Sequence, residues 1–506
     1  MHAITGLGLL VLGCSDPFAF DPTSTQQSVA ANEPGDGEEE EEICAASTEW
    51  LPVTPSELQA FKPLPHPAGE CAFYRGVWQT FLVATQPDAS GQPAILSFPN
   101  VDTMFTSALQ KAPNRAILGG IKQAGTRDIV VDQNGRSLYY GIQANQSFAD
   151  FLSDNDLDNL DGLLALGADN GPNGRARRLF FPEGMMEFKA AWQDITGLDP
   201  ADYSTFITAT ATVPTLSIVG DRIVEDPDNP REVTVALLAL HAVFTLPGHP
   251  EFIWGTMEHS EGGFDTRAED LKRDVAPTFF DRNPSATDPN NLSETGIVSM
   301  DPHVLYLAGT PANQANVPIS EPQLAQTFDA ATQTFVGQQT SIYRLFPASK
   351  SNTIDADDAI SSLNFNMGQL FEQVAPNDNR KFYRLVGAVW MDKPQFFDYD
   401  KRLLNDGTNP FVVMNGQAAI DDLTENGSDA DSSILAGEDR LSSTAMESFT
   451  QAPNSFPNCF ACHNTQAITE RGIPADMDTG GRVLLQPSLL NVSHILSEFV
   501  RVETAE

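Results

Sequence analysis

Three residues near the end of the chain have the types and the spacing that attach a haem group covalently. Cys459 and Cys462 are separated by two residues and His463 follows at once, which is the pattern C-x-x-C-H. Two thiols at this spacing can add to the two vinyl groups of a haem, and the imidazole that follows can bind its iron. We therefore expect one covalent haem c, with Cys459 and Cys462 as thioether anchors and His463 as the proximal iron ligand.

Two other kinds of site also use a C-x-x-C pair. A redox pair of the thioredoxin type should open a helix after a buried strand, but Pro453 and Pro457 precede Cys459 here. A zinc site needs further ligands, and the nearest other cysteine is Cys71, far away in the sequence. Haem attachment is the interpretation that fits best, with a dithiol or a zinc site as the alternatives.

The sequence leaves the sixth ligand of the iron open. Only 43 residues follow His463, so we expect the rest of the chain to form part of the haem pocket. A haem iron whose sixth position is open and one whose sixth position is filled by a protein ligand are expected equally. The candidate distal ligands are Met477, Met446, His494 and His259.

The beginning of the chain has the pattern of an export signal. Residues 3–13 are apolar over the length of a signal-peptide core, and this run is too short to span a bilayer. Residues 11–14 read Val-Leu-Gly-Cys and resemble a bacterial lipobox, in which Cys14 would carry lipid. We predict a lipoprotein-type signal peptide at residues 1–13 and a periplasmic protein held at the membrane by lipid alone. A plain signal peptide that ends at a cysteine is the alternative.

The charge of the chain is strongly acidic. Residues 14–42 are rich in Pro, Ser, Thr, Gln and Gly and end in five glutamates, which predicts a disordered acidic tether. The whole chain has 68 acidic and 29 basic residues and a net charge of −39. This sign argues against nucleic acid as a partner and leaves a basic redox protein as a suitable one.

Two cysteines remain once Cys14, Cys459 and Cys462 have been assigned. In an oxidising compartment we expect Cys44 and Cys71 to form a disulfide. It would close a loop of about 27 residues and stabilise the fold by about 3 kcal/mol. Two buried free thiols are the alternative.

The order of strand and helix patterns predicts an α+β fold, a β-rich body with a helical C-terminal haem-binding segment. Residues 43–310 are mostly strand patterns, and residues 311–506 mix helices and strands, carry the haem motif and pack on the body. A hairpin is expected around Asn134–Gly135, with residues 129–131 pairing with residues 138–140 and both turn residues at positive φ. Other expected elements are strands at 233–240, 251–257 and 382–390 and helices at 146–152, 320–335, 360–374 and 487–500.

Several short strings accompany the haem motif. They are IKQAG at 121–125, VDQNG at 131–135, EFKAAW at 187–192, LH at 240–241, FIWGTMEH at 252–259 and TAMES at 444–448. Together they resemble the "cytochrome c family protein" group of bacterial exported proteins, over residues 60–500. That resemblance implies a chain of about this size with one C-terminal haem motif.

The motifs support three classes of function. The first is periplasmic electron transfer by a lipid-anchored cytochrome with a single haem. The second is a haem-dependent redox enzyme, a peroxidase or oxygenase with an open iron, for which Glu258 and His259 would be the acid–base pair. Adjacent residues of a strand alternate sides, so this dipeptide cannot point both side chains into one pocket. The third is a binding protein whose haem is structural or sensory.

Overall fold

The computed structural model of the chain describes its large sheet and the helices beside it. The described residues are 44–51, 70–105, 117–121, 128–130, 132, 134–168, 179, 181–219, 222–246, 249–260, 264–265, 305–307, 326–337, 343–344, 359–391, 435–437, 443, 445–446, 468–469 and 483–485.

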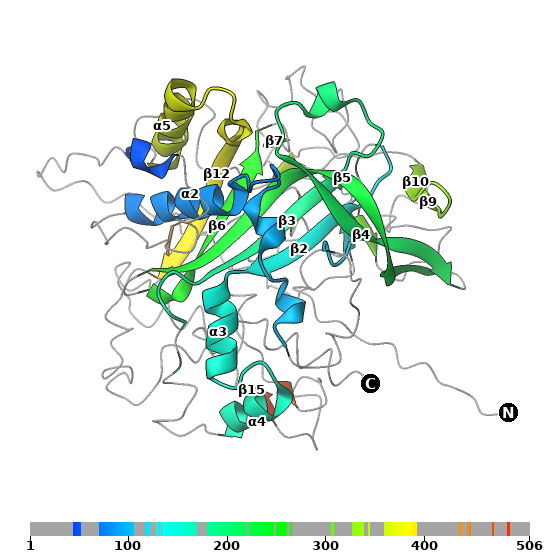
Figure 1. The fold of residues 1–506 in the computed structure, drawn as a ribbon, viewed down its shortest axis with the longest axis horizontal. Coiled ribbons are helices and arrows are strands. Elements are labelled where there is room, and N and C mark those ends of the chain that lie inside the picture. The colour runs from blue at the N-terminus through cyan, green and yellow to red at the C-terminus, as the bar shows by residue number, and fades with distance from the viewer. Residues whose placement is uncertain are drawn as a thin grey trace, which may run out of the picture.

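A seven-stranded antiparallel sheet forms the centre of the described chain (Figure 1). The strands follow the order β13-β12-β6-β5-β3-β2, and β4 also pairs with the long strand β5. The bounds are β2 (Leu138–Ala144), β3 (Met186–Asp194), β4 (Thr208–Val219), β5 (Arg222–Leu246), β6 (His249–His259), β12 (Tyr383–Met391) and β13 (Leu435–Gly437).

Four small two-stranded sheets and several helices complete the described elements. The sheets pair β1 (Asp128–Val130) with β8 (Leu305–Leu307), β9 (Gln326–Asp329) with β10 (Thr334–Gly337), β7 (Phe264–Asp265) with β11 (Tyr343–Arg344), and β14 (Ile468–Thr469) with β15 (Val483–Leu485). The helices are α2 (Cys71–Thr85), α3 (Gln146–Asp154), α4 (Leu160–Ala168) and α5 (Ala359–Val374). Short 3-10 helices are η1 (Thr48–Trp50), η2 (Ala94–Ser97), η3 (Val101–Thr103), η6 (Pro200–Tyr203) and η9 (Asn379–Phe382).

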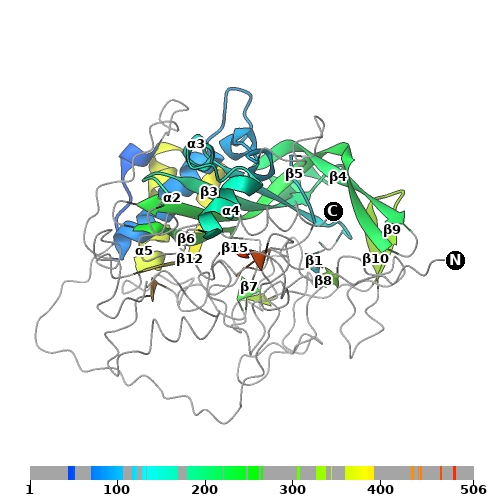
Figure 2. The ribbon, with the colours of Figure 1, turned by 90° about the horizontal axis from the view of Figure 1, so that it is seen from below.

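The described part of the chain is therefore β-rich, with one large antiparallel sheet and few helices, an architecture compatible with the α+β class. Figure 2 shows the sheet nearly edge-on, with β7 and β15 below it and α3 above it. Strands from both sides of residue 310 belong to the large sheet, because β12 pairs directly with β6. The described portions of the two predicted parts thus share one sheet.

One face of the large sheet packs on α2, and α5 lies beside that helix. Val77, Trp78 and Phe81 of α2 are fully buried in this core. Gly255 on β6 allows the close approach, since a β-carbon there would overlap the side chain of Val77. On α5, Asn364 accepts a hydrogen bond from Trp78 Nε1 (3.1 Å) and exchanges two with the backbone of β12 (2.9 Å each). This side-chain amide links α2, α5 and the sheet.

Five expected elements are confirmed. β5 and β6 cover the expected strands 233–240 and 251–257, and β12 covers 383–390 of the expected strand 382–390. The expected helix at 146–152 is α3, whose cap Asn145 accepts a hydrogen bond from the backbone of Phe148. The expected helix at 360–374 is α5, which ends at Val374, before the proline at 376.

The expected hairpin of residues 129–131 with 138–140 is wrong, although its turn forms. Asp132 and Arg136 are joined across the turn by a backbone hydrogen bond (2.8 Å), and Gly135 has φ 76°. Of the two expected turn residues, Asn134 and Gly135, only Gly135 has a positive φ. The flanking strands do not pair, because β1 pairs with β8. One edge of β2 pairs with β3, and bridges to Asn100 and Gly120 occupy positions along the other.

The expected helix at 320–335 is also wrong where the structure describes it, since β9 and β10 form a hairpin there. Gln333 stands in the turn at φ 58°, in the left-handed region. Its side-chain amide donates to the carbonyl of Leu216 on β4 (2.7 Å) and accepts from its amide (2.8 Å). These bonds reach a strand more than a hundred residues away, so tertiary contacts outweigh the local helical pattern.

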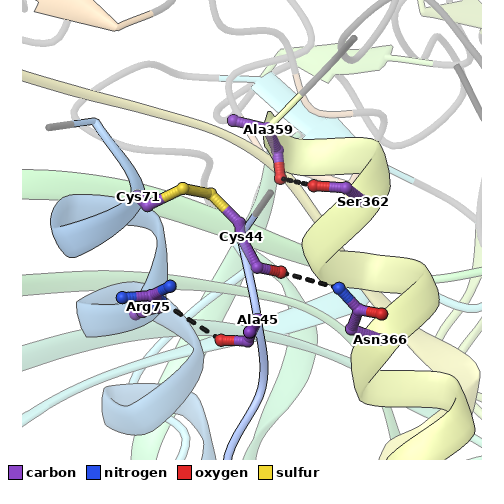
Figure 3. The surroundings of a disulfide bond; sticks show 7 residues. All are labelled: Cys44, Ala45, Cys71, Arg75, Ala359, Ser362 and Asn366. Carbon is purple, nitrogen blue, oxygen red and sulfur yellow. Dashed lines mark hydrogen bonds between the residues drawn. A yellow bond between two sulfur atoms is a disulfide. The ribbon is translucent and has the colours of Figure 1, made fainter. Parts of the chain in front are cut away.

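A disulfide between Cys44 and Cys71 ties the first described residues to the start of α2 (Figure 3). Their α-carbons lie 5.4 Å apart. Asn366 of α5 donates its side-chain amide to the carbonyl of Cys44 (2.8 Å), and Arg75 Nε donates to the carbonyl of Ala45 (3.1 Å). The predicted pairing is present, and it joins the beginning of the described chain to both helices.

Replacing Cys44 and Cys71 together by Ala is expected to lower the free energy of unfolding by about 3 kcal/mol, because the crosslink restricts the unfolded chain. Urea unfolding at neutral pH measures the change. Wild-type protein kept in a reducing agent is the matched control and should unfold at the same urea concentration as the variant. Equal stability of the variant and the oxidised wild type would contradict this expectation.

Candidate functional site

Most residues of the predicted haem site lie outside the described residues. These are Cys459, Cys462 and His463 of the motif, the candidate ligands Met477 and His494, and the predicted lipidation site Cys14. The expected signal peptide, the tether and the helix at 487–500 also fall there. The structure does describe two candidate distal ligands, Met446 and His259, and the sheet face next to Met446.

Met446 and Ala445 pack on the face of the large sheet that points away from α2. Both are buried, in a cluster with Leu138, Ala191 and Ala239 from three neighbouring strands. Tyr140 on β2 donates its hydroxyl hydrogen to the carbonyl of Ala445 (2.7 Å). Ala445 and Met446, which precede the C-x-x-C-H motif in the sequence, are therefore fixed to this face, which we call the second face.

The second face also carries polar side chains in the middle of otherwise apolar strands. Phe188 and Ala190 of β3 pack in the core under α2, so the alternating residues Glu187 and Lys189 point the other way. By the same alternation His241 on β5 and Thr256 on β6 point to the second face, because Leu240, Ala242 and Met257 lie in the α2 core. We call Glu187, Lys189, His241 and Thr256 the cross-strand polar cluster.

Strand register brings the members of this cluster together. Lys189 lies directly opposite His241, and His241 lies directly opposite Thr256. Opposite residues of antiparallel strands have β-carbons about 5 Å apart. Thr256 Oγ1 and His241 Nδ1 share a hydrogen bond of 2.9 Å, which fixes the orientation of the imidazole ring. Glu187 is one row further along, opposite Val243.

Glu187 is the most unusual member of the cluster. Its side chain is buried, with the residue 4% exposed, and its Oε2 has no hydrogen-bond partner. Burial raises the pKa of this carboxyl to about 8, against a smaller opposing effect of the Lys189 charge. Glu187 is therefore protonated at neutral pH. A protonated acid that lies one row from an oriented imidazole on the same face is a group that can donate a proton.

His259, the other described candidate ligand, is held by protein groups. The residue is completely buried, and its ring stacks on Phe206 with centroids 3.6 Å apart and meets Tyr383 edge-on at 5.0 Å. Its Nε2 lies 3.2 Å from the carbonyl of Thr205. Burial lowers the pKa of His259 to about 3, so the ring is neutral across the physiological range. Its neighbour Glu258 points to the second face, opposite Ala239 and Arg384.

Comparison of the chain with models of protein families, with curated proteins and with solved structures found no match. In the described part of the chain, no group of three or more His, Cys, Asp or Glu residues could hold a metal ion. No helix among the described residues is long and apolar enough to cross a membrane. The arguments for function therefore come from the haem motif and from the second face.

Sequence reasoning missed the cross-strand polar cluster as a site. The signal was present, because Glu187 and Lys189 interrupt an apolar strand, where charged residues are rarely fully buried. The strings EFKAAW and LH contain three of the four members. The sequence indicates that the strands at 233–240 and 251–257 are neighbours across a Pro-Gly turn. It does not indicate that β3 pairs with β5, nor the register of the three strands, and these assemble the cluster.

Proposed function

We propose that this chain is an exported, lipid-anchored c-type cytochrome with one haem, which passes electrons between periplasmic partners. The C-x-x-C-H motif carries the proposal. Cys459 and Cys462 would hold the haem by thioether bonds, and His463 would bind the iron from one side. A helical C-terminal segment around this motif and membership of the exported "cytochrome c family protein" group are part of the same proposal.

The described residues fit a covalent haem in two respects. The Cys44–Cys71 disulfide suits an oxidising compartment, where c-type haem is attached. Met446 has a thioether side chain and precedes the motif in the sequence, and its neighbour Ala445 is bound to Tyr140 on the sheet. When bound, the haem would supply one-electron redox chemistry. The protein's own part is to hold the motif against the second face and to keep water from it.

Among the two described candidates for the sixth ligand, Met446 suits the role better than His259. A ligand must turn its donor atom toward the iron, and Nε2 of His259 is already directed at the carbonyl of Thr205 within a stack of aromatic rings. Among the described residues Met446 packs in a mostly apolar cluster, whose side chains compete little for a thioether sulfur. Met477 and His494 stay as the further candidates.

Replacing the ligand is expected to convert a low-spin haem spectrum to a high-spin one and to let carbon monoxide bind readily. We expect this for Met446→Leu, which removes the sulfur and keeps the volume of the side chain. Met257→Leu is the matched control, because Met257 is equally buried under α2 on the other face. His259→Phe, Met477→Leu and His494→Gln test the remaining candidates. A low-spin wild type that none of the four ligand variants changes would contradict the proposed ligand set.

A haem-dependent redox enzyme is the second candidate, and the cross-strand polar cluster favours it. Glu187 and the His241–Thr256 pair would supply acid–base groups on the face where Met446 packs. Glu258 and His259, the pair considered from the sequence, cannot share this task because they point to opposite sides of β6. A wild type that is already high-spin and binds cyanide would favour the enzyme over electron transfer, and a peroxidase or oxygenase assay would then follow.

The proposed lipid anchor depends on Cys14. Cys14→Ser is expected to move the protein from the membrane fraction into the soluble periplasmic fraction, because a lipidated cysteine is the only anchor that we propose. Fractionation with an antibody against the mature chain measures the change. Ser15→Ala, next to the anchor, is the control and should stay with the membrane. An unchanged membrane fraction for Cys14→Ser would contradict the anchor.

A further inference from the structure

We propose that Asp132, Gln193 and Tyr203 form a pH-sensitive switch, in which one proton taken up by Asp132 reverses the direction of the hydrogen bonds along the three side chains. Asp132 opens the turn before β2, Gln193 lies on β3, and Tyr203 lies on η6. The switch therefore joins three segments of the described chain. It does not rest on the proposed haem, since none of the three residues belongs to the C-x-x-C-H motif.

The first ground is that two turns of the chain have the same hydrogen bonds and only one of them has a buried carboxyl. In residues 88–92 and 132–136, Oδ1 of the opening aspartate accepts from the backbone amides two and four residues later. A backbone hydrogen bond of 2.8 Å closes each turn, and each has a glycine at positive φ, 84° and 76°. Asp88 is partly exposed, whereas Asp132 is 2% exposed. This turn therefore forms without a buried carboxyl.

The second ground is a side-chain amide that joins the buried carboxyl to a tyrosine. Gln193 donates from Nε2 to Oδ2 of Asp132 (2.6 Å) and to the hydroxyl oxygen of Tyr203 (3.1 Å). These two bonds use both hydrogens of Nε2. At the other end of the amide, Oε1 of Gln193 is buried and has no hydrogen-bond partner in the described part of the chain. Such an amide can turn over when the group that it faces changes from acceptor to donor.

A proton on Asp132 makes this change. Burial raises the pKa of Asp132 to about 6, against the opposing hydrogen bonds from the backbone of Arg136, from Gln193 and from Asn134. The proton belongs on Oδ2, because Oδ1 accepts the two backbone hydrogen bonds of the turn. A protonated Oδ2 is a donor and favours the orientation in which Oε1 of Gln193 faces it. Oε1 then accepts from Asp132 and from Tyr203, whose hydroxyl changes from acceptor to donor.

The other groups around the turn remain in one charge state near pH 6 or are paired. The charged or titratable groups on the elements beside it are Arg136 in the turn, Tyr139 on β2, Asp194 on β3, Arg231 on β5, and Asp199 and Asp202 at η6. Asp194 binds both Arg136 (3.5 Å) and Arg231 (2.9 Å). Burial raises the pKa values of Tyr139 and Tyr203 to about 12, so both rings stay neutral. Asp199 and Asp202 are exposed.

The test is an NMR titration of the purified full chain from pH 8 to pH 4.5. The labels are 13C at the carboxyl carbon of Asp, 15N in the side-chain amide of Gln and 13C at the ring carbon that carries the hydroxyl of Tyr. We expect the signals of Asp132, Gln193 and Tyr203 to shift together, with a midpoint near pH 6. Asp88 is the internal control and should shift at lower pH, because hydrogen bonds from the side chain of Ser90 and the backbone of Gln92 lower its pKa.

Two variants test the coupling, and each one decides it alone if the other does not fold. Asp132→Asn keeps an oxygen for the turn and cannot ionise, so the signals of Gln193 and Tyr203 should stay constant over this range. Asp88→Asn, the matched change in the exposed turn, should leave all three shifts in place. In Gln193→Met, Asp132 should titrate about one pH unit higher, because its ionised form loses a donor, and Tyr203 should no longer follow it.

Three results would overturn the switch. The first is a Tyr203 signal that stays constant in wild type while Asp132 titrates. The second is a Tyr203 signal that shifts equally in wild type and in Gln193→Met or Asp132→Asn, which would show that the proton does not act through the amide. The third is a midpoint for Asp132 as low as that of Asp88, since the carboxyl would then stay ionised near pH 6.

Discussion

Replacing Cys459 and Cys462 together by Ala is expected to abolish all haem that survives denaturing gel electrophoresis. Only thioether bonds persist under those conditions, and these two residues are the proposed source of both. The measurement is haem staining of the protein, co-expressed with the cytochrome c maturation machinery, next to an antibody blot of the same gel.

The Cys44→Ala, Cys71→Ala protein is the matched control, because it also loses two cysteines and should keep its stain. A haem stain that remains in the Cys459→Ala, Cys462→Ala protein would show that the attachment site is elsewhere. Loss of stain in both double variants would indicate a folding defect in place of a lost attachment site.

Replacing Glu187 by Gln is expected to change how stability depends on pH. The pKa of Glu187 is about 8 in the folded protein and near 4.5 in the unfolded chain, so between these values the folded state holds a proton that the unfolded state has lost. Stability from this group is therefore fully present below pH 4.5 and is lost as the pH rises to 8, by an amount on the order of 5 kcal/mol. The Gln side chain has no proton to lose in this pH range, so Glu187→Gln is expected to abolish this pH-dependent loss of stability.

The comparison is made by urea unfolding of wild type and Glu187→Gln at pH 5, 7 and 9. The variant should gain on wild type from pH 5 to pH 8, the window between the unfolded and the folded pKa of Glu187, and the difference should change little from there to pH 9. Glu183→Gln, at an exposed site four residues earlier, should show the same pH dependence of the free energy of unfolding as wild type. Asp132, whose pKa burial raises to about 6, and His259, whose pKa burial lowers to about 3, contribute equally to all three proteins. Parallel curves for wild type and Glu187→Gln would contradict a buried, protonated Glu187.

The strongest local patterns of the sequence predicted their elements well. The expected strands at 233–240, within β5, and 251–257, within β6, are runs rich in apolar and β-forming residues that a Pro-Gly pair separates in the sequence, and α5 has an apolar stripe that ends before a proline. The Cys44–Cys71 pairing also followed from assigning the other cysteines by their patterns. In these cases the information lies within one segment or in residue type alone.

The features that sequence reasoning missed depend on contacts between distant segments. The β9–β10 hairpin is joined to Leu216 through Gln333, and the edge of β2 is occupied by Asn100 and Gly120. The cross-strand polar cluster needs the register of β3, β5 and β6, which no single strand specifies. Gly255 is needed because Val77 of α2 packs against it, and a lone glycine in a strand does not reveal its neighbour.

The most direct test of the central claim is a measurement on the unchanged protein. The full chain is co-expressed with the cytochrome c maturation machinery, purified, and examined by haem staining after denaturing electrophoresis and by the pyridine haemochrome spectrum. We expect one covalently bound haem for each chain, with the spectrum of a haem held by two thioether bonds. Purified, folded protein without haem stain would contradict the proposal that Cys459, Cys462 and His463 form a c-type haem site.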